Sequence, residues 1–451
     1  MNNKTAPQGA RTDRRDEIMF KTLLVFLAII LLVVGVWYVR QETGSSVDAG
    51  ASIQNPDEIK AIASGSPGNT IHGRVTTNQG AVYEGRIRFG GAEEAFWGDY
   101  FNGVKAENVW VDNVPEKALS VRRPIEIFGL TFPGWEEEID LVRPFMVRFG
   151  DIHTIENLGG ARIRVQMKSG RQTLLNANEL GDFDDGVRIW DMSQGIMDVD
   201  RNQIARIDFM PPSATGLDEP RLWGAVETTA GRFEGYIQWN REKGHGLDVL
   251  TGEVGGVQQV IGFAAMSGVE RMDDGRCVVT MAGGDTYVMS GGTYDGCGNR
   301  GLYIDDARYG RVLVSWSAFV RIDLQLVRTG PEYNDFPQGQ PLWGWVVDSV
   351  GNRAEGRIVF DLDEDETTDT LDAPRGEVNF SIPFGAVAQV SPRGDPHALV
   401  TLNSGEVVAL EHGGDLSREN GGLLVFEEGD SNPKYVAWRN VELIGLSPNR
   451  R

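Results

Sequence analysis

The stretch GRFEGYIQWN, residues 231–240, has two relatives in the chain, GAVYEGRIRFG at 80–90 and GNRAEGRIVFD at 351–361. In all three, a turn glycine precedes a second glycine and then apolar residues at every other position. This alternation predicts a β-strand that returns from a hairpin turn. The second glycine, Gly85, Gly235 or Gly356, interrupts that strand, where a missing side chain permits sharp bending or the close approach of another backbone.

The repeated stretch belongs to six related units of two alternating kinds, which we call odd and even. Units four and six stay in constant register, so that Cys277 corresponds to Ala398 and Leu302 to Leu423. With 57 glycines and short apolar runs between turns, the chain is expected to be all-β. We predict three odd–even pairs, at 71–210, 222–325 and 342–447, and favour an elongated array of pairs over a closed ring.

Each unit ends on a short pattern of apolar and aromatic residues, such as VRFGDIHTI at 147–155. The spacing predicts a strand end, one tight helical turn and a last strand. Together with the glycine pair and the polar hairpin, this pattern resembles the small five-stranded barrels of the Sm-like and SH3-like classes. The resemblance implies six tandem small β-barrels that follow the N-terminal segment.

Unit four also has Asp295 and Asn299 at the Asp-x3-Asn spacing that helps Sm proteins bind RNA bases. The basic residues that accompany this motif are not consistently present, since Gly421 follows the equivalent Asn420. We therefore interpret these residues as turn formers. The chain has 43 Lys plus Arg against 65 Asp plus Glu, a net charge of -22, which also argues against a nucleic-acid partner.

Residues 22–39, TLLVFLAIILLVVGVWYV, carry no charge and predict a transmembrane helix. Basic residues precede this segment, so the positive-inside rule places the tail 1–21 in the cytoplasm. The repeats, joined by a flexible linker at 40–70, would then be periplasmic or extracellular in a single-pass membrane protein. A cleaved signal peptide ending near the small residues 49–51 is the alternative, but they lie far beyond the apolar run.

The acidic stretch DLDEDETTDTLD, residues 361–372, is reminiscent of a calcium loop, with Asp361, Asp363, Asp365 and Asp372 as candidate ligands. Glu366 stands where such loops use glycine, and no helices flank the stretch. We favour a solvated hairpin tip. The five histidines are scattered without metal-ligand spacing, and we expect no cofactor.

Two further features bear on stability and partners. Cys277 and Cys297 lie in a strand and a loop of unit four and suit one local disulfide, although a buried thiol and a free loop thiol fit the sequence too. The first odd unit carries an insertion at 111–144. Its candidate partner contacts are Arg122, Arg123, Phe132 and Trp135, with a lid over its own barrel as the alternative.

No nucleophile elbow, phosphate loop or dinucleotide fingerprint is present. The sequence therefore favours a tethered envelope scaffold or protein-interaction module over an enzyme, with a protein partner in the envelope and a homo-oligomer as a further option. The alternative is an envelope glycan-binding protein or a carboxylate-dependent hydrolase. A deep pocket that holds two carboxylates of altered proton affinity would favour the hydrolase.

Overall fold

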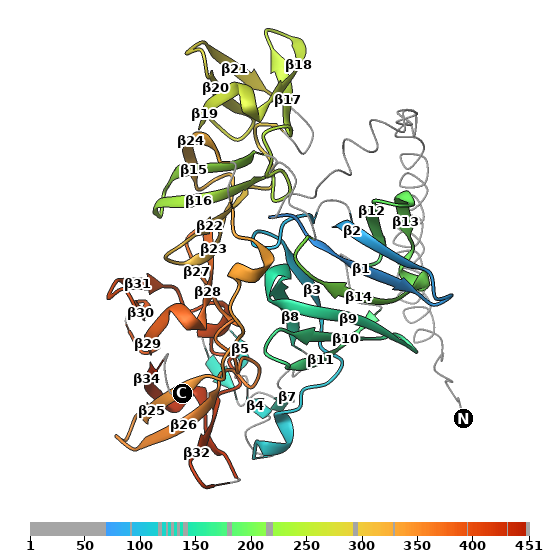
Figure 1. Cartoon of the computed structure of the whole chain (residues 1–451). Helices are drawn as coiled ribbons and strands as arrows, with labels where there is room; N and C mark the ends of the chain where they lie inside the picture. Colours follow the sequence, from blue (N-terminus) through green and yellow to red (C-terminus); the bar gives the residue numbers. More distant parts are fainter. Residues whose placement is uncertain are drawn as a thin grey trace, which may run out of the picture. The chain divides into compact units, whose positions relative to one another are not determined.

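The computed structural model describes residues 69–90, 93–115, 120–122, 125–127, 130–132, 136–138, 143–177, 183–212, 220–291, 296–327, 330–394, 396–430 and 432–447 (Figure 1). All of them belong to one compact unit, Lys60–Arg451. The tail 1–21, the apolar segment 22–39 and nearly all of the linker lie outside these residues. Within the described part of the chain, no helix is both long and apolar enough to cross a membrane.

The described chain is all-β and its sheets are antiparallel. The first large sheet has the strand order β11-β10-β9-β14-β1-β2-β12-β13. Its strands are β1 (His72–Thr77), β2 (Val82–Phe89), β9 (Ile152–Gly159), β10 (Arg162–Met167), β11 (Gln172–Asn176), β12 (Val187–Asp191), β13 (Gly195–Val199) and β14 (Ile204–Phe209). We call residues 71–210 pair 1.

The second large sheet has the order β18-β17-β21-β20-β19-β24-β15-β16-β22-β23-β28-β27. Residues 222–325, called pair 2, supply most of it, and β27 and β28 come from 342–447, called pair 3. The strands are β15 (Arg221–Thr228), β16 (Gly231–Trp239), β17 (Val249–Val254), β18 (Val257–Gly262), β19 (Met266–Arg271), β20 (Arg276–Met281), β21 (Thr286–Ser290), β22 (Leu302–Asp306), β23 (Gly310–Val314), β24 (Phe319–Val327), β27 (Thr370–Arg375) and β28 (Val378–Pro383).

The third large sheet, from pair 3, has the order β31-β30-β29-β34-β25-β26-β32-β33. Its strands are β25 (Trp343–Asp348), β26 (Arg353–Val359), β29 (Val387–Ser391), β30 (Ala398–Leu402), β31 (Val407–Leu410), β32 (Leu423–Glu427), β33 (Lys434–Val436) and β34 (Val441–Leu446). Three two-stranded ribbons complete the fold, namely β3 (Tyr100–Val104) with β8 (Pro144–Arg148), β4 (Ser120–Arg122) with β7 (Glu136–Glu138), and β5 (Ile125–Ile127) with β6 (Leu130–Phe132).

The two units of each pair exchange strands instead of forming separate barrels. In pair 3, the first hairpin of the odd unit, β25 and β26, lies between β34 and β32 of the even unit. The even hairpin, β30 and β31, continues from β29 of the odd unit, and the backbone N–H of Glu411 after β31 donates to the Pro374 carbonyl in β27. The same order recurs in the other two large sheets.

This exchange corrects the expectation of six small barrels. No sheet of the described residues closes on itself; the last strands of both units pair with each other instead, β9 with β14, β19 with β24 and β29 with β34. Because those strands would otherwise be the edges of two separate sheets, their pairing satisfies backbone groups that would face solvent.

The interrupting glycines are placed where two backbones approach closely, as the sequence predicts. A Cβ atom at Gly85 would lie 1.9 Å from the carbonyl oxygen of Trp190 in β12. The equivalent distances are 1.9 Å from Gly235 to Asp305 and 2.0 Å from Gly356 to Phe426. No other residue leaves room for the exchanged strand at this crossing.

The predicted tight turn before the last strand is present in five of the six units as a short 3-10 helix. These helices are η3 (Phe149–Asp151), η5 (Arg201–Gln203), η6 (Phe263–Ala265), η8 (Phe384–Ala386) and η10 (Trp438–Asn440). Four of them begin with a buried aromatic residue. The other 3-10 helices of the described residues are η1 (Val111–Asn113), η7 (Tyr333–Asp335) and η9 (Gly414–Leu416).

Contacts join every pair to both others. Strand β23 of pair 2 pairs with β28 of pair 3, and their side chains share one hydrophobic core. The rings of Trp97 in pair 1 and Tyr236 in pair 2 lie 4.1 Å apart. Ion pairs link pair 1 to pair 3, for example Arg143 to Asp361. An elongated array in which only neighbours touch is therefore wrong for the described residues.

Candidate functional site

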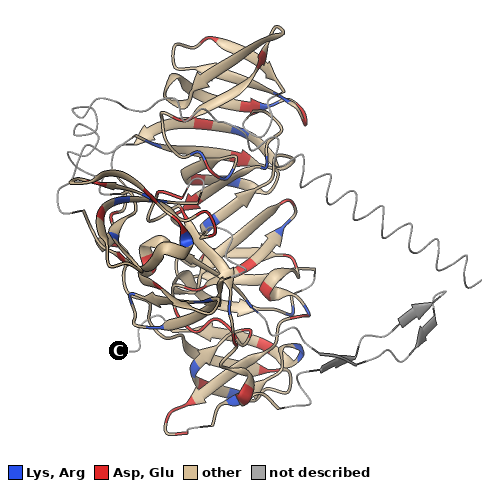
Figure 2. Ribbon diagram, turned by 90° about the vertical axis from the view of Figure 1, so that its right-hand side faces the viewer, with Lys and Arg blue, Asp and Glu red and all other residues tan. Residues whose placement is uncertain are grey.

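The acidic stretch 361–372 is buried against pair 1 and is not a solvated hairpin tip. Asp361 and Asp363 are 6% and 8% exposed. Acidic residues occur on strands and loops throughout the described chain (Figure 2), so acidity alone does not distinguish this stretch. Burial distinguishes this stretch, because a buried carboxylate needs a charged or hydrogen-bonded partner.

Three cations of pair 1 supply such partners. Arg143 lies 3.1 Å from Asp361, and Lys105 forms an ion pair with Asp363. Arg171 contacts Asp365 at 2.8 Å and binds Asp369 through two hydrogen bonds of 2.6 Å.

Three of the four candidate calcium ligands are thus each turned towards a different cation. Among the residues that the structure describes, no group of three or more potential ligands is arranged to hold a metal ion. The fourth candidate, Asp372, accepts a hydrogen bond from the Thr370 hydroxyl at 3.0 Å.

A cavity of about 400 Å³ opens beside these ion pairs, and we call it the acidic pocket. Strand β8 forms one wall with Pro144, Phe145, Met146 and Val147. The charged part of the lining consists of seven carboxylates and three cations, namely Asp361, Asp363, Glu364, Asp369, Asp372, Asp415 and Glu419 with Lys105, Arg143 and Arg171. The pocket therefore has an apolar wall and an excess of acidic groups.

Comparison between the pairs separates the structural carboxylates from the others. Asp361 corresponds to Asn240 of pair 2, and both have left-handed backbone, with φ of 49° and 55°. Each side chain accepts a backbone N–H from a loop of the even unit, from Gly421 and Arg300 respectively. Asp361 is therefore a turn residue, as short polar side chains tolerate this conformation.

Asp369 is also structural, because its side chain closes a backbone turn. Its Oδ2 atom accepts the backbone N–H groups of Asp365 and Glu366, both at 2.9 Å. In the equivalent turns, Asp99 of pair 1 accepts two backbone N–H groups and Asp248 of pair 2 accepts one.

Glu364, Asp372 and Asp415 have no acidic counterpart in pair 2, where Lys243, Thr251 and Tyr294 occupy the equivalent sequence positions. The backbone N–H of Asp372 donates to Asp415 at 2.6 Å, which brings η9 against β27. The Oε2 atom of Glu364 is buried and has no hydrogen-bond partner. These three carboxylates therefore distinguish the pocket from the equivalent region of pair 2, although Glu93 of pair 1 occupies the same turn position as Glu364.

Burial and mutual repulsion raise the proton affinity of the pocket. Burial is the main cause of the raised pKa at Asp361, Glu364, Asp372 and Asp415. It raises the pKa of Asp361 to about 7 against the opposing charge of Arg143. The pKa values of Glu364 and Asp415 are well above their ordinary ranges, because neighbouring carboxylates add to the effect of burial. The pKa of Asp372 is also raised by burial.

These shifts predict that the protein loses stability as the pH rises. Carboxylates with a raised pKa bind protons in the folded state that the unfolded chain has already released, so unfolding becomes easier between about pH 4 and pH 7. We expect a lower Tm at pH 8 than at pH 5.5, and a smaller difference in Asp415→Asn. Thermal melting of both proteins measures this. Asp274→Asn, which removes a carboxylate that is 94% exposed, serves as the control; an equal effect in both variants would contradict the assignment.

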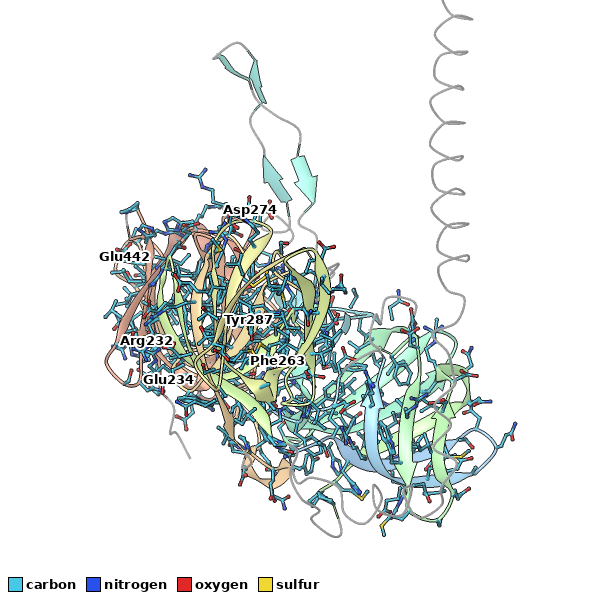
Figure 3. The ribbon with its side chains drawn as sticks, turned by 90° about the horizontal axis from the view of Figure 1, so that it is seen from above. Arg232, Glu234, Phe263, Asp274, Tyr287 and Glu442 are labelled. Carbon is cyan, nitrogen blue, oxygen red and sulfur yellow. A yellow bond between two sulfur atoms is a disulfide. The ribbon has the colours of Figure 1, made fainter. Side chains whose placement is uncertain are left out.

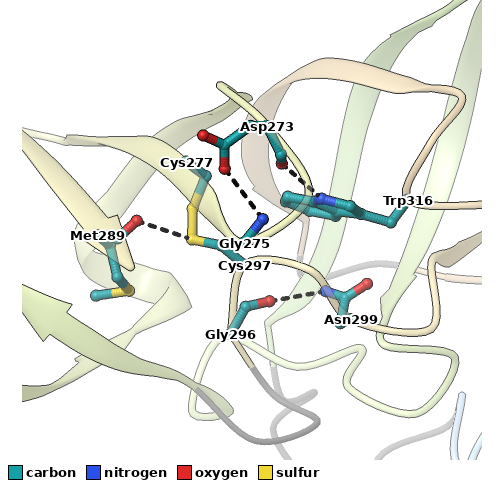
Figure 4. Close-up of a disulfide and its surroundings, with 8 residues drawn as sticks. All are labelled: Asp273, Gly275, Cys277, Met289, Gly296, Cys297, Asn299 and Trp316. Carbon is teal, nitrogen blue, oxygen red and sulfur yellow. Dashed lines mark hydrogen bonds between the residues drawn. A yellow bond between two sulfur atoms is a disulfide. The ribbon is translucent and has the colours of Figure 1, made fainter. Parts of the chain in front are cut away.

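Cys277 and Cys297 form a disulfide with a Cα–Cα distance of 5.6 Å (Figure 4). It ties β20 to the loop that carries Asn299. The side-chain oxygen of Asn299 accepts the N–H of Gly301 at 2.7 Å, so this residue acts as a turn former. Asp295, its partner in the Asp-x3-Asn spacing, lies outside the described residues.

The residues just before and at the start of the insertion 111–144 contact pair 3. Asn108 donates to the Leu362 carbonyl at 3.1 Å, and the Trp110 ring lies 5.9 Å from that of Phe426. Both of these flanking contacts are to pair 3. Of the candidate partner contacts, Arg123 and Trp135 lie outside the described residues, and Arg122 and Phe132 belong to β4 and β6, whose side chains are not described.

Comparison with known proteins adds no assignment, since neither a protein-family model nor a curated protein nor a solved structure matches this chain. The internal repeats are therefore the available reference. Sequence reasoning identified Asp361, Asp363, Asp365 and Asp372 but missed Glu364 and Asp415. Their departure from the basic and aromatic residues at the equivalent positions of pair 2 is the signal that could have found them.

Proposed function

We propose that the chain is a membrane-tethered, extracytoplasmic interaction module that holds a cationic group of a protein partner in the acidic pocket. In this proposal, residues 22–39 are the anchor and 40–70 the tether. Six units related to small Sm-like or SH3-like barrels, interleaved in pairs, form the binding body. The observation that carries the proposal is the excess of carboxylates over cations in a cavity of about 400 Å³.

The lining of the pocket suits the side chain of lysine. An ammonium group can be surrounded by Glu364, Asp372 and Asp415, none of which forms an ion pair with Lys105, Arg143 or Arg171 among the described contacts. The aliphatic stem can lie along Pro144 and Met146 of β8. Arginine fits the same chemistry with a wider, planar head group.

Isothermal titration calorimetry of the full-length protein in detergent tests this proposal, with pentalysine as the probe and penta-acetyl-lysine as the neutral control. We expect pentalysine alone to bind at low salt, and the variant Asp372→Asn/Asp415→Asn to bind it at least tenfold more weakly. The matched control Asp274→Asn/Asp323→Asn makes the same two substitutions at exposed positions. Equal weakening in both variants would show attraction by net charge alone and would reject the pocket.

Asp372 and Asp415 also support a second candidate, a carboxylate-dependent hydrolase. Two adjacent carboxyl groups of raised pKa in one cavity are the kind of pair that supplies a general acid and a base to glycoside cleavage. Incubation of the purified protein with envelope polysaccharide tests this candidate. Release of reducing ends by the unmodified protein, and none by Asp415→Asn, would favour the hydrolase over the interaction module.

A further inference from the structure

The crossing of β15, β16 and β22 in pair 2 differs from the equivalent crossing of the other two pairs. In pair 3, Trp343 of β25 lies opposite Arg357 of β26, which lies opposite Phe426 of β32. The Arg357 guanidinium is 4.4 Å from the centre of the Phe426 ring. In pair 1, Arg86 covers Trp190 in the same way at 5.1 Å. In both pairs, an arginine therefore covers an aromatic ring at this crossing.

Pair 2 has no arginine at this crossing. Trp223 of β15 lies opposite Tyr236 of β16, and Tyr236 lies opposite Asp305 of β22. Two aromatic residues and one carboxylate thus replace the arginine arrangement. A hollow of about 560 Å³ lies over this face, lined by Trp223, Tyr236, Arg232, Glu234, Asp305 and Arg308.

The polar groups around the hollow differ in their surroundings. The Oδ2 atom of Asp305 is buried beside Gly98 of pair 1 and has no hydrogen-bond partner. Arg308 makes two hydrogen bonds to Asp306, of 2.9 Å and 2.6 Å, and a third of 3.1 Å to the Arg232 carbonyl. The Tyr236 ring is held by Trp97 at 4.1 Å. Arg232 and Glu234 are exposed on the same face of β16 and lie close to each other (Figure 3).

We propose that this hollow of pair 2 binds a neutral saccharide. An aromatic ring offers an apolar face to the C–H groups of a sugar, and the carboxylates and guanidinium groups accept and donate hydrogen bonds to its hydroxyls. Arg308 forms an ion pair with Asp306, and Arg232 and Glu234 add one charge of each sign to the rim, so the rim favours an uncharged ligand over an acidic or basic one. The site is separate from the acidic pocket and shares no lining residue with it.

Binding of oligosaccharides by the full-length protein tests this inference, in a polyoxyethylene detergent that carries no sugar head group. The probes are chitotetraose, cellotetraose and maltotetraose, measured by saturation-transfer difference NMR and calorimetry. We expect at least one of them to bind, and Trp223→Ala to weaken that binding about tenfold or more. Trp343→Ala, at the equivalent position of pair 3, is the matched control and should bind as the unmodified protein does.

Glu234→Gln provides a second variant in case Trp223→Ala alters the fold. Its side chain is exposed, so we expect an unchanged melting curve and binding that is about threefold to tenfold weaker. The inference is overturned if none of the three oligosaccharides binds up to roughly 10 mM, or if Trp343→Ala weakens binding equally. It is also overturned if a proline-rich decapeptide binds at Trp223 and the saccharides do not.

Discussion

Replacement of Gly235 by alanine is expected to lower the free energy of unfolding by about 4 kcal/mol. The added Cβ atom would lie 1.9 Å from the Asp305 carbonyl oxygen, far inside van der Waals contact. The opposing atom belongs to the backbone of β22, so a side-chain rotation cannot relieve the overlap. Strands β16 and β22 would have to separate, with the loss of ladder hydrogen bonds.

Chemical denaturation measured by tryptophan fluorescence gives this free energy. Gly283→Ala is the matched control, because Gly283 lies in a turn of the same pair and has no heavy atom within 4 Å of its added Cβ. We expect the control to change stability by less than about 0.5 kcal/mol. Equal stability of Gly235→Ala and the unmodified protein would mean that the exchanged strands do not cross at this glycine.

Arg171→Met is expected to destabilise the protein by about 3 to 5 kcal/mol at pH 7, because it leaves buried carboxylates without their cation. Although burial raises the pKa of Asp369, the charge and hydrogen bonds of Arg171 hold it below its ordinary value. A carboxylate with a lowered pKa contributes stability above the pKa of the unfolded chain and loses it as the pH falls. The effect of the substitution should therefore shrink towards pH 3.

Arg188→Met is the control for this experiment. Arg188 and Asp198 form an ion pair whose side chains are 47% and 66% exposed, so its loss should cost less than about 1 kcal/mol. Denaturation of both variants at pH 7 and pH 3 separates the two cases. A small effect of Arg171→Met at both pH values would contradict the docking of pair 1 on the acidic stretch.

Local features of the fold could be predicted from the sequence. The glycines at 85, 235 and 356 predicted a close backbone approach, and the closing pattern predicted the tight turns that η3, η6 and η8 form. Both depend on residues within one short segment. The exchange of strands could not be predicted in this way, because equivalent strands of the two units have similar patterns and the pattern does not specify which copy a strand pairs with.

Less of the candidate site could be predicted from the sequence. A run of alternating acids such as 361–372 is typical of a solvated tip, and its burial depends on Lys105, Arg143 and Arg171, which are distant in the sequence. Asp415 reaches the same pocket from η9. Only the folded chain brings these groups together. The sequence does show, however, that Glu364 and Asp415 replace the non-acidic residues Lys243 and Tyr294 of pair 2.

The proton balance of pentalysine binding tests the proposed role of the acidic pocket most directly. Calorimetry at pH 7 in two buffers of different ionisation enthalpy gives the number of protons exchanged on binding. We predict proton release, because an ammonium group in the pocket lowers the proton affinity of Asp361, Glu364 and Asp415. Asp372→Asn/Asp415→Asn should release fewer protons, and Asp274→Asn/Asp323→Asn as many as the unmodified protein. Binding without any proton release would contradict a cation site at these carboxylates.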